Sequence, residues 1–194
     1  RDFCLSRGLG DVYKRQGQFN PQGKLTVSFP RTVGQVPIFY NHKNTGRPEG
    51  FYESVFITKY LDSPNQPLFP FGYGLSYTTF EYSEIQMEDK QLTRDGKLNV
   101  SVKVKNTGKY KGTETVQLYI RDLVASVTRP VKELKSFRKV ELKPGEEKKV
   151  EFVITEKDLR FWNDKKQFIS EPGKFHLFIG TDSENVKKAE FVLL

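Results

Sequence analysis

Apolar and polar residues alternate along much of the second half of the chain, which is the pattern of β-strands with one buried face. Between residues 98 and 104, apolar residues occupy every second position without interruption. Further alternating or apolar runs follow at 116–120, 150–154, 175–179 and 191–194. Residues that favour turns separate these runs, at 106–108, 144–145 and 172–173. The pattern predicts a mainly β fold, an immunoglobulin or fibronectin type III-like β-sandwich with six or seven short strands.

Two details of this pattern carry further expectations. Phe137 is out of phase with the apolar residues that follow it, Val140 and Leu142, so we expect a β-bulge near Arg138 and Lys139. No helix longer than one or two turns is indicated in this part of the chain.

The aromatic and histidine side chains of this half are expected to be structural. Tyr119 and His176 have the outward phase of their strands, which predicts positions on the surface of a sheet. Phe161 and Trp162 lie between two strand patterns and are expected to close one end of the sandwich. Asn99 begins a sequon for N-glycosylation, but it falls within a predicted strand, so we interpret the match as incidental.

The chain before residue 80 has a different pattern. Short alternating runs at 25–29 and 36–38 predict two strands, and residues 41–68 form a long polar stretch rich in Asn, Gly, Pro and Tyr. A loop of that length within a compact domain is usually functional or poorly ordered. Gly72 and Gly74 in the sequence FPFGYG are expected to allow tight backbone turns that a residue with a Cβ resists.

The first sixteen residues, RDFCLSRGLGDVYKRQ, match nothing that follows in pattern. They resemble translated adapter sequence of the kind that contaminates some assembled reading frames, and a natural, poorly ordered terminus is the alternative. Residues 1–16 are therefore set apart from the fold. The single cysteine of the chain, Cys4, lies here; it cannot form an internal disulfide and is expected to be a free, exposed thiol.

Composition and charge exclude several classes of protein. The net charge is +8, but residues 1–79 carry 9 basic and 5 acidic side chains while residues 80–194 carry 23 and 19, so the excess is +4 in each part. Because the two signs are interspersed, no nucleic-acid partner is predicted. Two histidines and one cysteine without ligand spacing predict no metal and no other cofactor. No apolar run approaches the roughly 18 residues of a membrane span, and no secretory signal is visible on this chain.

Two sets of sequence segments carry a resemblance to a known family. GQFNPQGKLTVSFPRTVGQVPIFYNHKNTGRP and YLDSPNQPLFPFGYGLSYTTFEYS resemble the end of the α/β sandwich domain of glycoside hydrolase family 3 β-glucosidases. NVSVKVKNTGKYKGTETVQLYIRD, SVTRPVKELKSFRKVELKPGE and DLRFWNDKKQFISEPGKFHLFIGTDS resemble the C-terminal fibronectin type III-like domain of that family. The resemblance covers about residues 17–194. It implies that 17–79 is the remnant of an incomplete α/β sandwich domain and 80–194 a fibronectin type III-like domain.

The implied parent protein is a retaining exo-β-glycosidase that hydrolyses terminal β-D-glucosyl residues. Such enzymes use two carboxyl groups about 5–5.5 Å apart. The resemblance places the nucleophile in an upstream barrel domain and the acid/base in the upstream part of the α/β sandwich domain, so no catalytic residue is expected here. Glu49, Glu53 and Asp62 are the carboxylates of the long loop, but nothing apolar surrounds the two glutamates and Asp62 is more simply a turn residue, so no catalytic pair is predicted among them.

The candidate substrate contacts lie at the start of the long loop. His42, Lys43 and Arg47 are polar side chains of the kind that bind sugar hydroxyls, and they are proposed as a substrate rim. The same residues would also suit a solvated loop, and both interpretations stay open.

The rival to a hydrolase fragment is a carbohydrate-binding or cell-surface interaction sandwich without an attached enzyme. In the first case the partners are the upstream barrel and α/β sandwich domains of the same chain and a β-glucoside or oligosaccharide substrate, with a periplasmic or secreted location. The sequence leaves glucoside against xyloside specificity and the oligomeric state open. Because 17–79 would lack most of its sheet, we expect it to be less stable than 80–194.

Overall fold

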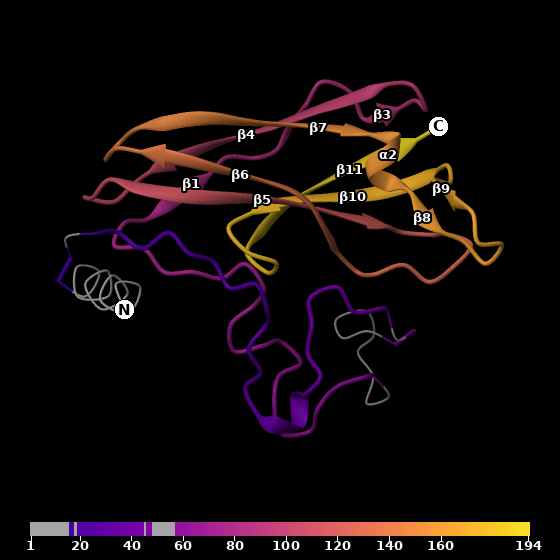
Figure 1. Ribbon diagram of the computed structural model, residues 1–194, viewed down its shortest axis with the longest axis horizontal. Coiled ribbons are helices and arrows are strands. Elements are labelled where there is room, and N and C mark those ends of the chain that lie inside the picture. Colours follow the sequence, from indigo (N-terminus) through magenta and orange to yellow (C-terminus); the bar gives the residue numbers. More distant parts are fainter. Residues whose placement is uncertain (1–15, 18, 45, 48–56) are drawn as a thin grey trace, which may run out of the picture.

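Strand formation in the second half follows the alternation of the sequence, and the β-sandwich prediction is confirmed (Figure 1). The computed structural model describes residues 16–17, 19–44, 46–47 and 57–194. Its strands are β1 (Phe80–Tyr82), β2 (Gln86–Met87), β3 (Gln91–Leu92), β4 (Lys97–Asn106), β5 (Gly112–Asp122), β6 (Glu133–Leu142), β7 (Glu147–Thr155), β8 (Phe161–Trp162), β9 (Phe168–Ile169), β10 (Gly173–Gly180) and β11 (Val186–Leu193). Two short helices, η1 (Val33–Gln35) and α2 (Glu156–Leu159), complete the elements of the described residues.

The strands form two packed sheets and a small hairpin. In the four-stranded sheet, β4 pairs with β7 on one side and with β1 and β2 on the other. The five-stranded sheet has the order β3-β11-β10-β5-β6, in which only the β3–β11 pair is parallel. The hairpin of β8 and β9 lies at one end of the sandwich (Figure 1).

The inward phase of each long strand forms one hydrophobic core between the sheets. The buried apolar residues of this core include Leu98, Val100, Val102 and Val104 of β4, Val116, Leu118 and Ile120 of β5, Val150, Phe152 and Ile154 of β7, Phe175, Leu177 and Ile179 of β10, and Phe191 and Leu193 of β11. Phe175 and Phe191 stack across β10 and β11 with ring centroids 5.3 Å apart. The inward sets predicted from the alternation are confirmed.

The β-bulge of β6 lies a few residues before its predicted place. In the register of β5 and β6, Leu118 opposes Ser136 whereas Tyr119 opposes Leu134. Lys135 is therefore the extra residue, and the prediction of a bulge at Arg138 and Lys139 is wrong. Phe137, Val140 and Leu142 all lie after the extra residue and alternate regularly, so Phe137, opposite Gln117, has the outward phase and is 55% exposed.

The two strands predicted before residue 80 are absent from the described residues. Between 25 and 29 the chain makes backbone hydrogen bonds with 68–73 near its two ends, and the only bridge is Phe29 with Phe69. Residues 36–38, where the sequence predicts the second strand, directly follow the 3-10 helix η1 and form no strand. Val27, Phe29 and Val36 are 57%, 45% and 63% exposed, so most of the apolar residues that suggested strands face solvent.

Of three expectations for aromatic residues, two change. Tyr119 has the outward phase of β5 yet is completely buried, because the chain before residue 80 covers this part of the sheet. Phe161 is buried beneath the Arg129 guanidinium, 4.4 Å from the ring centroid, as expected for a residue that closes the sandwich. Trp162 is 66% exposed and packs on Phe168 of the hairpin, so the expectation that it closes the sandwich is wrong.

Candidate functional site

The chain before residue 80 is joined to the sandwich by buried polar side chains. The amide of Asn106, at the end of β4, is fully buried and uses both its oxygen and its nitrogen. Its Oδ1 accepts from the Thr78 hydroxyl at 2.6 Å and from the Gly108 amide at 3.0 Å. Its Nδ2 donates to the carbonyls of Tyr110 and Leu142 at 2.8 and 3.0 Å. Asn106 thereby fixes the chain just before β1 begins.

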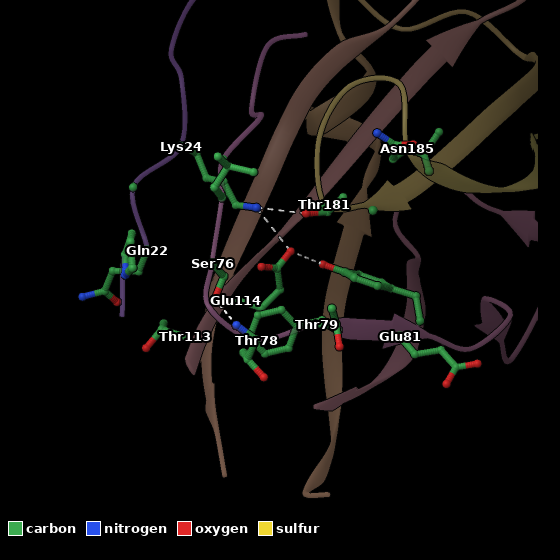
Figure 2. A pocket seen from close by; sticks show the side chains of 18 of the residues that line it. Gln22, Lys24, Ser76, Thr78, Thr79, Glu81, Thr113, Glu114, Thr181 and Asn185 are labelled. Atoms are coloured by element: carbon green, nitrogen blue, oxygen red, sulfur yellow. Dashed lines mark hydrogen bonds and ion pairs between the residues drawn. The ribbon is translucent and has the colours of Figure 1, made fainter. Parts of the chain in front are cut away.

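A groove of about 720 Å³ lies where this chain meets the sandwich (Figure 2). Its walls come from residues 21–24 and 74–82, from the start of β5 and from the turn between β10 and β11. Hydroxyl and amide side chains dominate the labelled lining, and Lys24 points across it toward Glu114 and Thr181 in Figure 2. Apolar residues such as Phe80 and Ile179 complete the lining.

Glu114 is the buried carboxylate of this groove, with 4% of its surface exposed. Its Oε1 accepts from Lys24 Nζ at 3.4 Å and from the Tyr82 hydroxyl at 2.8 Å, while Lys24 also donates to Thr181 Oγ1 at 2.9 Å. Burial, followed by the Glu114 charge, raises the pKa of Tyr82 well above its usual range. The phenol therefore stays protonated and donates to the carboxylate.

This arrangement suits Glu114 to joining two parts of the chain better than to acid/base catalysis. A general acid needs a proton to give, and a nucleophile needs a free oxygen aimed at the substrate. The Glu114 oxygen instead accepts from a cation and a phenol that come from opposite sides of the groove. In this groove, polar side chains thus join segments that lie far apart in the sequence.

Replacing Glu114 with Gln is expected to lower the free energy of unfolding by about 1–3 kcal/mol, because Lys24 would be left without its charge partner in a mostly buried position. The matched control is Glu141→Gln, which breaks the exposed pair of Lys111 and Glu141 and should cost less than about 1 kcal/mol. Urea unfolding of the three chains measures both values. Equal effects of the two substitutions would contradict a stabilising role for the buried pair.

The three proposed rim residues lie outside this groove. His42, Lys43 and Arg47 are all exposed. The backbone of the first two is held by the loop between β5 and β6, because the His42 carbonyl accepts from the Val131 amide at 2.9 Å and Lys43 forms a bridge with Pro130. The Arg47 carbonyl accepts from the Thr58 amide at 3.0 Å. The structure thus fixes the backbone at these positions and leaves the side chains available to solvent.

The β5–β6 loop begins at a buried carboxylate whose environment predicts a pH effect. Burial raises the pKa of Asp122 to about 6, against the opposing hydrogen bond from the Val124 amide. Its Oδ2 is buried without a hydrogen-bond partner. Charged groups that act on it are Arg129, which lowers the pKa, and Glu171 and Glu133, which raise it.

Because the folded state holds the Asp122 proton more tightly than the unfolded state, Asp122 contributes stability that is expected to be lost as pH rises from about 4 through 6. Asp122→Asn mimics the protonated form and should flatten this part of the profile and raise stability at pH 7. Thermal unfolding of both chains at several pH values tests the expectation. A variant that keeps the slope of the parent chain would show that another group causes it.

Several sequence candidates lie outside the described residues: Cys4 with the rest of residues 1–15, and Glu49 and Glu53. Asp62 is described and is exposed on the loop, as a turn residue would be. Within the described ranges, no group of three or more His, Cys, Asp or Glu side chains could hold a metal ion. The same ranges contain no helix that is long and apolar enough to cross a membrane.

The buried polar residues of this contact were not singled out from the sequence, although one signal was present. Glu114 shares the inward phase of Val116 and Leu118, and a charged residue at such a position indicates a buried partner. Lys24, which supplies the charge, lies 90 residues earlier, and nothing local identifies it. The phase could predict a buried carboxylate but could not identify its partner.

Comparison with known proteins shows which proteins the chain is similar to. Residues 114–183 match the family described as fibronectin type III-like domain. The chain is 51% identical over 179 residues to a periplasmic β-glucosidase of Salmonella typhimurium, covering 92% of this chain and 23% of that protein. It is 45% identical over 168 residues to a β-xylosidase of Formosa agariphila, covering 87% and 22%. A crystal structure of β-glucosidase from Listeria innocua in complex with glucose superposes with a TM-score of 0.87 at 42% identity, covering 94% and 26%.

The chain spans about a quarter of the length of these relatives. The match extends over both the sandwich and the chain before it, because it covers more residues than the fibronectin type III-like domain alone. The resemblance read from the sequence is thereby confirmed. The chain is similar to these β-glucosidases and to the β-xylosidase along nearly its whole length, and residues 114–183 match the fibronectin type III-like family.

Proposed function

We propose that this chain is the non-catalytic C-terminal part of a retaining exo-β-glycosidase that removes terminal β-D-glucosyl residues. The observation that carries the proposal is the similarity to β-glucosidases along nearly the whole chain, in sequence with the Salmonella protein and in structure with the Listeria protein. A sandwich without an attached enzyme has no such support, because the likeness includes the chain before residue 80.

The proposed role of the sandwich is that of a scaffold for the domains before it. The catalytic carboxylates would lie in those domains, and the carboxylate buried in the groove, Glu114, is bound by Lys24 and Tyr82. Residues 17–79 would be the end of the α/β sandwich domain and residues 80–194 the fibronectin type III-like domain. Contacts such as that between Asn106 and Thr78 would fix the position of one domain relative to the other.

His42, Lys43 and Arg47 are proposed to form part of the substrate rim. Their exposed side chains and hydrogen-bonded backbone support this role, since a rim needs fixed attachment and free polar groups. The upstream domains would supply the rest of the pocket. A periplasmic or secreted location is proposed for the whole protein, on the name of the Salmonella relative.

The proposal is tested by comparing the longer protein with this chain on aryl β-glucosides and aryl β-xylosides. The longer protein should hydrolyse at least the glucoside, and the 194-residue chain should hydrolyse neither above background. The ratio of the two rates also determines the sugar specificity. An inactive longer protein would contradict the proposal, as would turnover by the 194-residue chain that survives repurification and disappears in Asp62→Asn, Glu49→Gln or Glu53→Gln.

A further inference from the structure

Two polar side chains on the outer face of β5 are buried where a solvent-facing surface would be expected. Gln117 and Tyr119 both have the outward phase, and they are 3% and 0% exposed. The turn at Gly72, the turn between β10 and β11 at Thr181, and the ring of Tyr40 cover them. A fully buried amide and phenol on the outside of a sheet need hydrogen-bond partners in whatever covers them.

The amide of Gln117 joins two turns. Its Nε2 donates to the Gly72 carbonyl at 3.1 Å and to the Thr181 carbonyl at 2.5 Å, and its Oε1 accepts from the Tyr119 hydroxyl at 2.5 Å. Gly72 has φ of +81°, and a Cβ at this position would lie 2.1 Å from Gln117 Oε1. The Gln117 amide therefore packs directly against the backbone of Gly72, where a residue with a Cβ would not fit.

The ring of Tyr119 supports the segment that leads to the proposed rim. Its centroid lies 5.7 Å from that of Tyr40 in an edge-to-face arrangement, and Tyr40 stacks on Phe71 at 4.3 Å. The Tyr40 hydroxyl accepts from the Leu134 amide at 3.3 Å. Two residues further along, the His42 carbonyl accepts from the Val131 amide. Residues 40–43 are thus held between the face of β5 and the β5–β6 loop.

We infer that Gln117 and Tyr119 of the fibronectin type III-like domain are positioning residues, which hold residues 40–43 and with them the sugar-binding rim. The inference rests on the proposed function. Neither side chain would touch the sugar. Each acts through the segment that it supports, so its loss should weaken substrate binding and leave the chemical step nearly unchanged.

One arm of the test needs no enzyme activity and uses the 194-residue chain. In Tyr119→Ala, hydrogen exchange at the Val131 and Leu134 amides should become about tenfold faster or more, because the groups that accept from them would move. Gln117→Ala should act in the same direction. Unchanged exchange within β4 shows that the sandwich is intact. Tyr110→Ala removes a ring of the same type that is 62% exposed, and it should leave all these amides unchanged.

The other arm uses the longer protein with an aryl β-glucoside. Tyr119→Ala should raise KM about tenfold, the effect of losing one well-placed hydrogen bond, with kcat within about twofold of the parent. Tyr119→Phe keeps the ring and should restore KM, whereas Tyr110→Ala should have no effect on it.

The two arms separate the possible failures. Unchanged exchange at Val131 and Leu134 in Tyr119→Ala would overturn the positioning role. Faster exchange with an unchanged KM, or a fall in kcat alone, would overturn the link to the rim. A longer protein without β-glycosidase activity would refute the proposed function, and with it the link to a sugar rim, while the exchange arm would still decide whether Tyr119 holds the segment.

Discussion

Leu177→Ala is expected to lower the free energy of unfolding by about 3–4 kcal/mol. Leu177 lies on β10, the central strand of the five-stranded sheet, and is completely buried between its neighbours Ala189 of β11 and Ile120 of β5. Alanine would remove apolar surface from the core and leave a cavity that the paired strands on both sides cannot close. Urea unfolding followed by circular dichroism measures the change.

The control for this substitution is Val153→Ala on β7, where the side chain is 55% exposed. It also shortens an apolar side chain in a strand, but it leaves no cavity and should cost less than about 1 kcal/mol. Comparable effects of the two substitutions would mean that the face of β10 assigned to the core is not tightly packed.

Gly72→Ala is expected to release the chain before residue 80 from the sandwich, at a cost of about 2–5 kcal/mol to that contact. The positive φ would strain an alanine by roughly 1–2 kcal/mol. The new Cβ would also displace the Gln117 amide and its buried hydrogen bonds, which adds roughly 1–3 kcal/mol. Exchange of the Ser183 amide, which donates to the Phe71 carbonyl, should become faster in proportion.

Gly145→Ala separates the two contributions to this cost. Gly145 has φ of +76°, close to that of Gly72, but nothing lies within 4 Å of the Cβ that alanine would add. It should therefore cost the backbone strain alone and leave the Ser183 amide unaffected. If both variants had the same effect on exchange at Ser183, the contact between Gly72 and Gln117 would contribute nothing to docking.

The sandwich could be predicted from the sequence because each strand records its own buried face. The alternation at 98–104 depends only on which side of β4 faces the core, and the turn at Gly145 needs only a residue that tolerates positive φ. The bulge could not be located from the pattern, because Phe137, Val140 and Leu142 all lie after the extra residue Lys135 and alternate regularly between the two faces. Local patterns thus predict where the strands lie and which face of each strand is buried.

The contact between the two parts of the chain could not be predicted in this way. The alternation in β5 predicts that Tyr119 lies on the surface. The side chain that covers it, Tyr40, lies 79 positions earlier, and no local pattern indicates that the two meet. The run at 25–29 reads as a strand, although it meets one neighbour only at its ends. Such pairings depend on the arrangement of distant segments.

The division near residue 79 and the lower stability of residues 17–79 stay predictions. The structure adds contacts that oppose early release of this part, among them Gln117 with Gly72 and Asn106 with Thr78. Limited proteolysis is expected to begin at exposed basic residues of the loop, such as Lys43 and Lys59. Whether residues 24–40 stay attached after the first cut will show how strongly these contacts hold.

The bulge at Lys135 has a consequence for association between molecules. β6 is the outer strand of its sheet, so no strand of the described residues pairs with the backbone groups along one of its sides, and such an edge can recruit a strand from another chain. The extra residue breaks the regular spacing of those groups, and the exposed Arg138 and Lys139 place like charges along the same edge. Edge-to-edge aggregation through β6 is thereby disfavoured.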